Sequence, residues 1–201
     1  MIEPTAQPPS PVAPATGKKI RASKKVQGGF LFLTANTHKR IPVFREPVLC
    51  EVFFRELDFY RNRYGFLLHA YVLLPDHFHL LLDFPPQKSF ASFLRDFKSA
   101  IGRLVVDWLK ENRRIALIEQ LQLARPPMRR KDARFCVLQP NSYVRAVTSR
   151  TMFKQKLDYI HANPVREGLV ERAVNYPYSS LRSYELGGGP IRIDPHNLIL
   201  D

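Results

Sequence analysis

Apolar residues along the chain recur with two periods, and these periods predict its strands and helices. Continuous apolar runs predict buried strands at residues 30–35, 66–74 and 77–84. Apolar residues spaced by three and four predict two helices, one from Pro47 to about Tyr64 and one from Phe90 to Leu109. Ser89 precedes the second helix and is expected to cap it. Only Pro75-Asp76 separates the second and third runs, which predicts an antiparallel hairpin.

The later part of the chain predicts a fourth strand and a third helix. Phe135–Leu138 is a short apolar run, and a helix is expected from about Thr148 to Asn163, capped by Thr148 or Ser149. Residues 110–134 are expected to form a basic loop. The order strand, helix, strand, strand, helix, strand, helix predicts an α+β, ferredoxin-like (RRM-like) antiparallel sheet. Helices would pack on one face, the third strand would be central, and the other face would be available for chemistry.

Length and composition predict one domain with a tail at each end. A chain of 201 residues suits a single domain. Residues 1–27 are rich in Pro and then Lys and are expected to be disordered, the domain to span 28–184, and a C-terminal tail to follow at 185–201. The sequence has two cysteines, no secretory signal and no run of 18 apolar residues, so a cytosolic, reducing location is expected.

The chain is strongly basic, with a formal net charge of +13. Such a charge predicts an anionic partner, and nucleic acid is the leading candidate because the basic residues lie throughout the sequence. A basic surface that serves solubility, or a protein of the membrane surface, are the alternatives.

His77 and His79 are the most informative polar residues in an otherwise apolar strand. Successive side chains of a strand point to opposite faces, so the two imidazoles share a face while Phe78 enters the core. Two imidazoles on one face can bind one metal ion, although a chance surface pair gives the same pattern. Tyr159 and Asn163 likewise share a face of the last helix because they are four residues apart. By themselves they are more typical of a boundary tyrosine and a helix stop before Pro164 than of a catalytic pair.

Taken together, these motifs resemble the single-tyrosine HUH transposases of the IS200-like family, and most closely the REP-associated tyrosine transposases. The resemblance covers about residues 28–184. It rests on Phe32-Leu33-Thr34 with Arg40 and Phe44, residues 70–82 around His77-Phe78-His79, Lys98, residues 159–170 (Tyr-Ile-His-Ala-Asn-Pro-Val-Arg-Glu-Gly-Leu-Val), and Tyr176-Pro177-Tyr178-Ser179-Ser180.

The resemblance implies a HUH endonuclease that takes part in DNA transposition and recombination. Tyr159 would cleave single-stranded DNA and form a 5′-phosphotyrosine link, with a divalent metal, Mg²⁺ or Mn²⁺, bound by His77, His79 and Asn163. The substrates would be hairpin-forming palindromic repeats that are cut and rejoined. The protein would act in the bacterial cytoplasm at the nucleoid, as a monomer rather than a dimer and without a membrane partner.

Basic residues are expected to hold the DNA strand, although for each of them a solvated surface charge is an equally good interpretation. The candidates are Lys98, Arg103, Arg129, Arg130, Lys131, Lys156 and Arg166. Two other functions stay open. One is a non-catalytic ferredoxin-like nucleic-acid-binding protein, and the other is a metal-dependent phosphoesterase that uses an activated water.

Overall fold

The structure, a computed structural model, describes residues 28–123 and 136–194. Its regular elements, in chain order, are β1 (Gly29–Asn36), α1 (Pro47–Tyr64), β2 (Leu67–Leu74), β3 (His77–Phe84), α2 (Phe90–Glu111), α3 (Ile115–Leu123), β4 (Tyr143–Ala146), α4 (Arg150–Arg166) and α5 (Leu181–Leu186). Short 3-10 turns, η1 to η3, lie at His38–Arg40, Val43–Arg45 and Ala173–Asn175.

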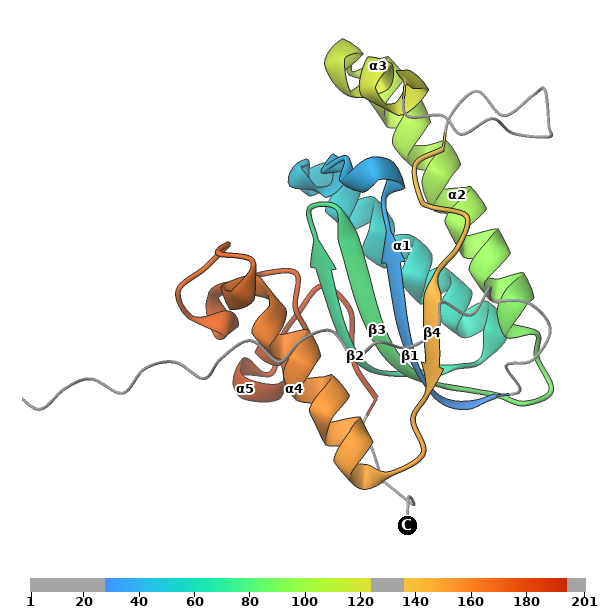
Figure 1. Ribbon diagram of the computed structural model, residues 1–201, viewed down its shortest axis with the longest axis vertical. Helices are drawn as coiled ribbons and strands as arrows, with labels where there is room; N and C mark the ends of the chain where they lie inside the picture. Colours follow the sequence, from blue (N-terminus) through green and yellow to red (C-terminus); the bar gives the residue numbers. More distant parts are fainter. Residues whose placement is uncertain (1–27, 124–135, 195–201) are drawn as a thin grey trace, which may run out of the picture.

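The four strands form one antiparallel sheet in the order β2-β3-β1-β4 (Figure 1). This order, with α1 between β1 and β2 and α2 between β3 and β4, is the ferredoxin-like α+β arrangement that the sequence predicts. The hairpin of β2 and β3 and the central position of β3 are confirmed. Because β3 pairs on both sides, the backbone of its histidines is held by two neighbouring strands.

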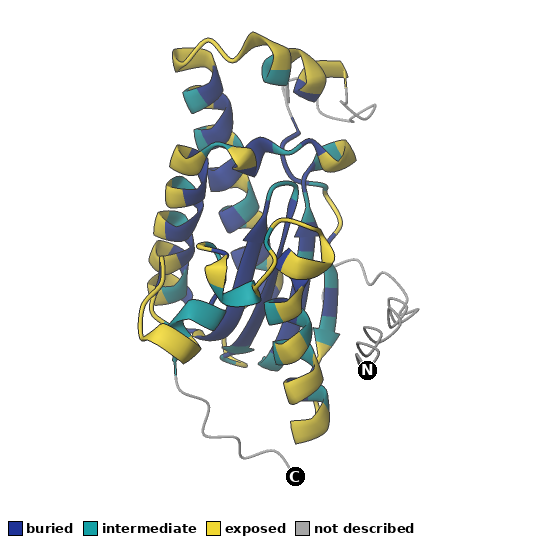
Figure 2. Ribbon diagram, turned by 90° about the vertical axis from the view of Figure 1, so that its left-hand side faces the viewer, coloured by how far each residue is buried: buried dark blue, intermediate teal, exposed yellow. Residues whose placement is uncertain are grey.

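One face of the sheet carries the main core, which α1 and α2 cover (Figures 1 and 2). Aromatic rings interlock here: Phe53 of α1 contacts Phe78 of β3 and Phe97 of α2, at ring-centroid distances of 4.9 and 5.4 Å. Phe78 is fully buried. The residue between the two histidines therefore anchors β3 to this core and leaves both imidazoles on the opposite face.

The other face is covered in part by α4, which packs mainly on β2 and also contacts β3 (Figure 1). Phe153 and Ile160 of α4 join a second apolar cluster with Phe32, Val72 and Leu81 of the sheet. The sequence predicts that all helices pack on one face of the sheet, and α4 is the exception. The apolar residues of α4 require a partner, and the free face of β2 and β3 provides it.

Helix ends follow the predicted signals. Ser89 and Ser149 each accept a hydrogen bond from the backbone N–H three residues on, at 3.2 Å, and so cap α2 and α4. Gly65 ends α1 in the left-handed region, at φ 71°, where glycine has no Cβ penalty.

The predicted fourth strand at Phe135–Leu138 is wrong. Val137 and Leu138 are buried, but Leu138 makes only an isolated bridge to Thr37. The fourth strand is instead Tyr143–Ala146, which pairs with Leu31–Thr34 of β1. A continuous apolar run indicates that a segment is buried but does not show that it pairs in a sheet. The actual strand is short, and Val144 is its residue in the main core.

Two helical features also differ from expectation. The segment predicted as a basic loop contains α3, and residues 124–135 lie outside the described residues. Helix α4 does not stop at Asn163 but continues through Pro164 to Arg166. The proline removes one N–H donor, yet Glu167 N–H donates to the Asn163 carbonyl and Leu169 N–H to the Pro164 carbonyl, at 2.9 Å each.

The chain after α4 returns to the outer edge of β2. Leu73 N–H donates to the Tyr178 carbonyl and Ser180 N–H to the Tyr71 carbonyl, at 2.9 Å each. Further on, the Asp194 carboxylate contacts the Arg61 guanidinium at 2.6 Å. The packed region thus continues past residue 184 to Asp194. No helix among the described residues is both long enough and apolar enough to span a bilayer.

Candidate active site

His77 and His79 lie side by side on the α4 side of β3. Their ring centroids are 5.0 Å apart, and the side chains are 4% and 3% exposed. In the register of the sheet, His77 faces Asn36 and His79 faces Thr34 of β1. Two nearly buried imidazoles at this distance are close enough to act on one bound group.

Each histidine is oriented through Nδ1. The Thr34 hydroxyl lies 2.7 Å from Nδ1 of His79, and the Asp76 carboxylate lies 2.7 Å from Nδ1 of His77. An Nδ1–H that donates to these oxygens leaves the Nε2 lone pair available. Nε2 of His79 is buried and has no hydrogen-bond partner among the described residues. A buried acceptor without a hydrogen-bond partner costs folding free energy, so its presence suggests that this nitrogen binds a ligand.

The surroundings of both imidazoles favour the neutral form. Burial lowers the pKa of His77, while its hydrogen bond to Asp76 acts in the opposite direction. Burial lowers the pKa of His79 well below its ordinary value, and the positive charges of the neighbouring side chains lower it further. Neutral imidazole is the form that binds metal ions, so the environment suits the predicted role.

Tyr159 of α4 lies against His79. The centroids of their rings are 5.2 Å apart, and the tyrosine ring also meets the edge of Phe32, at 5.9 Å. The tyrosine is half-buried, since α4 covers only part of this face. The structure thus brings the histidine pair and Tyr159 together within one chain, although 80 residues separate His79 from Tyr159 in the sequence.

Asn163 lies one helical turn after Tyr159 and is 3% exposed. Its amide Nδ2 donates to the Tyr159 carbonyl at 2.6 Å. This bond fixes the side chain and leaves Oδ1, the atom through which an amide binds metal ions, out of the contact. Asn163 therefore couples the position of the tyrosine to a possible third ligand.

His77, His79 and Asn163 can supply only part of the coordination shell of a divalent cation, so the remaining positions would be open to other ligands. Among residues 28–123 and 136–194, no three His, Cys, Asp or Glu side chains gather as a metal-binding group. Two imidazole nitrogens and one amide oxygen supply three neutral ligands, which leaves positions for water and phosphate oxygens. The residues present fit a metal that shares its coordination with an anionic substrate.

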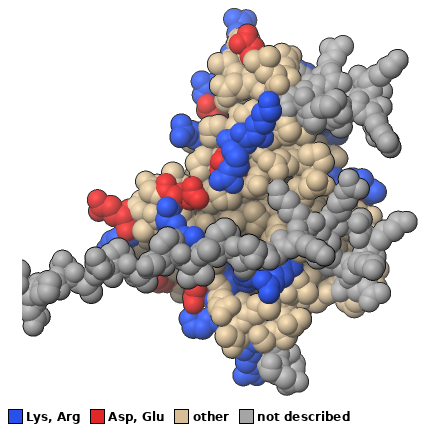
Figure 3. Space-filling view, in the orientation of Figure 1, with Lys and Arg blue, Asp and Glu red and all other residues tan. Residues whose placement is uncertain are grey.

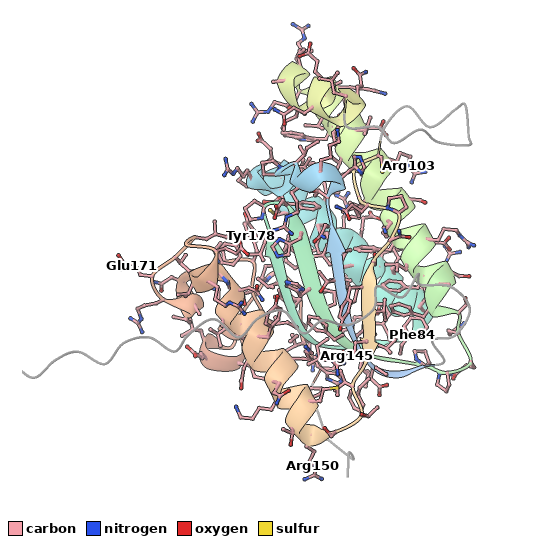
Figure 4. The ribbon with its side chains drawn as sticks, in the orientation of Figure 1. Phe84, Arg103, Arg145, Arg150, Glu171 and Tyr178 are labelled. Atoms are coloured by element: carbon pink, nitrogen blue, oxygen red, sulfur yellow. The ribbon has the colours of Figure 1, made fainter. Side chains whose placement is uncertain are left out.

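Positive side chains surround the tyrosine. The Lys156 ammonium lies over the Phe32 ring, 4.8 Å from its centroid, and the Arg166 guanidinium lies 5.1 Å from the centroid of the Tyr159 ring. Arg145 of β4 extends toward α4 (Figure 4) and helps to lower the pKa of Lys156, although burial is the larger cause. Lys and Arg side chains stand in the middle of this face (Figure 3). Such a cluster favours an anion beside Tyr159.

The other predicted DNA-binding residues lie elsewhere. Lys98 of α2 is directed inward: its ammonium donates to the carbonyls of Gln139 and Pro140 and to the Ser142 hydroxyl. This placement favours a structural role for Lys98. Arg103 is exposed on α2, away from α4 (Figure 4). Arg129, Arg130 and Lys131 lie outside the described residues.

Several residues of the site were missed from the sequence. Thr34 and Asp76 orient the histidines, and Arg40 pairs with Asp76 at 2.6 Å. Asp76 had a usable signal, because a carboxylate directly before a candidate ligand is a common partner for its ring. The contribution of Thr34 depends on the register of β1 with β3, which the sequence does not specify.

A cavity of about 550 Å³ lies apart from this site. It opens between α1 and the segment before Asp194. Its lining residues are Glu51, Phe54, Arg55, Asp58, Tyr178, Pro190, Ile191 and Arg192. None of these residues belongs to the cluster of His77, His79 and Tyr159, so the cavity is separate from the candidate active site.

Comparisons with known proteins place the sequence and the fold beside transposases. Residues 32–120, which include both histidines, match the family model described as "Transposase IS200 like". The match confirms the resemblance over this stretch. No protein of curated function matches.

Two solved structures are similar. One is a REP-associated tyrosine transposase bound to a REP hairpin, with 20% identity, a TM-score of 0.56, and coverage of 88% of this chain and 90% of that chain. At this identity the likeness shows the fold. The other is a crystal structure from Deinococcus radiodurans R1, with 23% identity, coverage of 67% of this chain and 90% of that one, and a TM-score of 0.44. Its fold agreement is too low to support an argument.

Proposed function

We propose that this chain, whose residues 32–120 match the model of the IS200-like transposase family, cleaves and rejoins single-stranded DNA through Tyr159 with the help of a divalent metal ion. The observation that carries the proposal is the 5.2 Å separation of the Tyr159 and His79 rings within one chain, with Nε2 of His79 unpaired among the described residues.

The proposed reaction is a transesterification at phosphorus. The Tyr159 oxygen attacks the scissile phosphate and loses its proton, while the bond from phosphorus to the 3′ oxygen breaks and that oxygen gains a proton. The products are a 5′-phosphotyrosine and a free 3′-OH. Because one phosphate ester replaces another, a 3′-OH can reverse the step and join strands without a nucleotide cofactor.

The metal, Mg²⁺ or Mn²⁺, would be held by Nε2 of His77, Nε2 of His79 and Oδ1 of Asn163. It would supply polarisation of the scissile phosphate and offset the charge that develops there. The protein's own part is to keep both imidazoles neutral, to fix Asn163 against the backbone of Tyr159, and to place cations around the phosphate. Lys156 and Arg166 are the cations best placed for this.

The substrate we propose is a DNA hairpin with single-stranded flanks. The support is the similar fold of the REP-associated tyrosine transposase that was solved with a REP hairpin, together with the net charge of +13. Since the histidines and the tyrosine meet in one chain, the geometry also supports action as a monomer. Arg129, Arg130 and Lys131, which lie outside the described residues, remain DNA contacts predicted from the sequence alone, whereas Arg103 lies on the other side of the sheet from Tyr159.

Covalent adduct formation tests the proposal. Labelled hairpin DNAs with single-stranded flanks are incubated with the protein and Mn²⁺ or Mg²⁺, and adducts are detected by denaturing electrophoresis. Tyr159→Phe should abolish the adduct, and so should EDTA or the double change His77→Ala and His79→Ala. The matched control is Tyr60→Phe, which alters a tyrosine of α1 on the opposite face of the sheet.

The outcomes separate the three functions. Adducts that persist in Tyr159→Phe would show that the nucleophile is wrong. If DNA cleavage persists in Tyr159→Phe and no adduct forms, the protein is a phosphoesterase that uses water. Hairpin binding that EDTA does not affect, with no cleavage of any substrate, would indicate a non-catalytic nucleic-acid-binding protein.

A further inference from the structure

The turn that follows β1 holds two consecutive non-glycine residues in the left-handed region. Lys39 has φ 49° and Arg40 has φ 60°. Side chains with a Cβ pay a steric cost for this conformation, and such strain persists only where surrounding contacts over-determine it. The two residues belong to the η1 turn, which lies beside the Pro75-Asp76 connection that leads into β3.

Backbone contacts bind this turn to the start of β3. Thr37 is fully buried, and both its N–H and its hydroxyl donate to the Asp76 carbonyl, at 2.8 and 2.9 Å. On the far side of the turn, Phe44 N–H donates to the Pro75 carbonyl at 3.0 Å. The left-handed residues are therefore held in place from both ends, directly beside His77.

The strained backbone aims the Arg40 side chain at Asp76. Nε of Arg40 lies 2.6 Å from Oδ2 of Asp76, and a terminal nitrogen of the guanidinium donates to Oδ1 of Asn36 at 3.1 Å. The other carboxylate oxygen, Oδ1, contacts Nδ1 of His77 at 2.7 Å. One carboxylate is thus shared between a guanidinium and an imidazole, with one oxygen for each.

We infer that Arg40 and Asp76 are positioning residues that hold His77 as the tautomer with its proton on Nδ1, so that Nε2 is free for a ligand. Nδ1–H of His77 donates a hydrogen bond to Asp76, and Arg40 holds the carboxylate in place against the ring. The inference deepens the proposed function, since it assigns the two residues to the metal-binding atom of His77. Carboxylates that fix the ring of a metal-binding histidine are a recurring device.

The Arg40 side chain is 45% exposed, so a direct contact with a DNA phosphate is the competing role. The two roles differ in what they alter. A positioning residue changes the tautomer of His77 in the metal-free protein, where no DNA is present. A phosphate contact changes the affinity for DNA and its salt dependence but leaves the tautomer as it is.

The test is the tautomer of His77, read in long-range ¹H–¹⁵N correlation spectra of metal-free protein labelled with ¹⁵N-histidine. At about pH 8 neutral imidazole dominates, and the signals of His77 are identified by their loss in His77→Gln. The wild-type protein should show the proton on Nδ1. Asp76→Ala and Arg40→Gln should each give a mixture of tautomers at His77, with those of the other histidines unchanged.

Metal affinity gives a second readout, measured by calorimetric titration with Mn²⁺ alone. Asp76→Ala should weaken binding about 10–100-fold, the range found for lost partners of metal-binding histidines. Arg40→Gly removes the same side chain while it relieves the left-handed strain, so it guards against a loss that comes only from misfolding. Arg55→Gln is the control, because Arg55 is exposed on α1, away from His77, and pairs with Glu56 at 3.7 Å.

An unchanged His77 tautomer in Arg40→Gly and Asp76→Ala would overturn the inference. A different result in Arg40→Gly is that the proton of His77 stays on Nδ1 while hairpin affinity and its salt dependence fall. That result would mean that Arg40 contacts phosphate instead. Because the spectra are recorded without metal or DNA, they test the tautomer of His77 even if Tyr159 forms no adduct. Failure of the proposed function and failure of this inference are therefore distinguishable.

Discussion

At the residue scale, the role of each polar side chain follows from which of its atoms are already engaged. His77 and His79 use Nδ1 for oxygens of the protein, and Nε2 of His79 has no partner among the described residues. Lys98 is the opposite case, because its ammonium already has protein acceptors. The same residue type is thus a candidate DNA contact at Lys156 and part of the internal structure at Lys98.

The role of Lys98 can be tested by Lys98→Met. Burial lowers the pKa of Lys98 to about 8, yet its ammonium holds the segment that leads into β4. We expect the free energy of unfolding, measured in urea, to fall by about 2–3 kcal/mol, since hydrogen bonds to a charged group are lost. Hairpin affinity should be unchanged. Lys154→Met, at an exposed pair with Asp158, should cost less than about 0.5 kcal/mol. If Lys98→Met is as stable as the wild type but binds DNA more weakly, Lys98 is a DNA contact after all.

At the element scale, α4 is the decisive piece, because it carries the tyrosine to the histidines. Its apolar residues pack on the sheet, and its polar side is tied to the chain that borders β2. Nε2 of His161 lies 2.9 Å from the Ser180 hydroxyl, which in turn donates to the Tyr71 carbonyl at 3.1 Å. This contact, two residues after Tyr159, fixes α4 to the edge of the sheet.

The contact between His161 and Ser180 predicts a pH dependence of stability. Burial lowers the pKa of His161 to about 4, from an ordinary value of 6.5, and the nearby Asp158 only partly opposes it. The folded protein therefore disfavours the charged imidazole. The stability that this histidine contributes is complete above about pH 6.5 and falls by on the order of 3 kcal/mol as the pH drops toward 4.

Urea unfolding of the metal-free protein over this pH range measures the effect. His161→Gln should show a shallower loss of unfolding free energy than the wild type. The difference between the two curves removes the contributions of the other titrating groups, His77 and His79 among them. Parallel curves would mean that His161 stays solvated enough to charge at its ordinary pKa.

At the scale of the whole molecule, the basic charge is arranged so that part of it faces the site. Lys156 and Arg166 lie beside Tyr159 on the α4 side, whereas Arg103 lies on α2 on the other side of the sheet (Figure 4). A net charge of +13 attracts DNA from any direction, whereas the cations next to the tyrosine are placed to hold the phosphate that we propose is cleaved.

The salt dependence of hairpin binding tests this division. Lys156→Gln and Arg166→Gln should each weaken binding and reduce the slope of log affinity against log salt by about 1, as expected for one lost phosphate contact. Arg103→Gln should leave the slope unchanged. Equal slopes in all three variants would mean that the DNA does not follow the face that carries α4.

Much of the fold could be predicted from the sequence because its signals are local. The strand period, Ser89 and Ser149 as caps, and Gly65 as a helix end depend on a few neighbouring residues. The fourth strand could not be placed, because Tyr143–Ala146 has little apolar pattern and is defined by its pairing with β1. The path of α4 through Pro164 likewise depends on bonds made beyond the proline.

By itself, the sequence determined that His77 and His79 share a face and that Tyr159 and Asn163 share another, since strand and helix periods fix both. It did not determine that the two faces meet. Only the tertiary structure decided this, because α4 packs its apolar residues on the face of β2 and β3 that α1 and α2 leave open. That packing sets the 5.2 Å between His79 and Tyr159, and the register of β1 with β3 supplies Thr34 to His79.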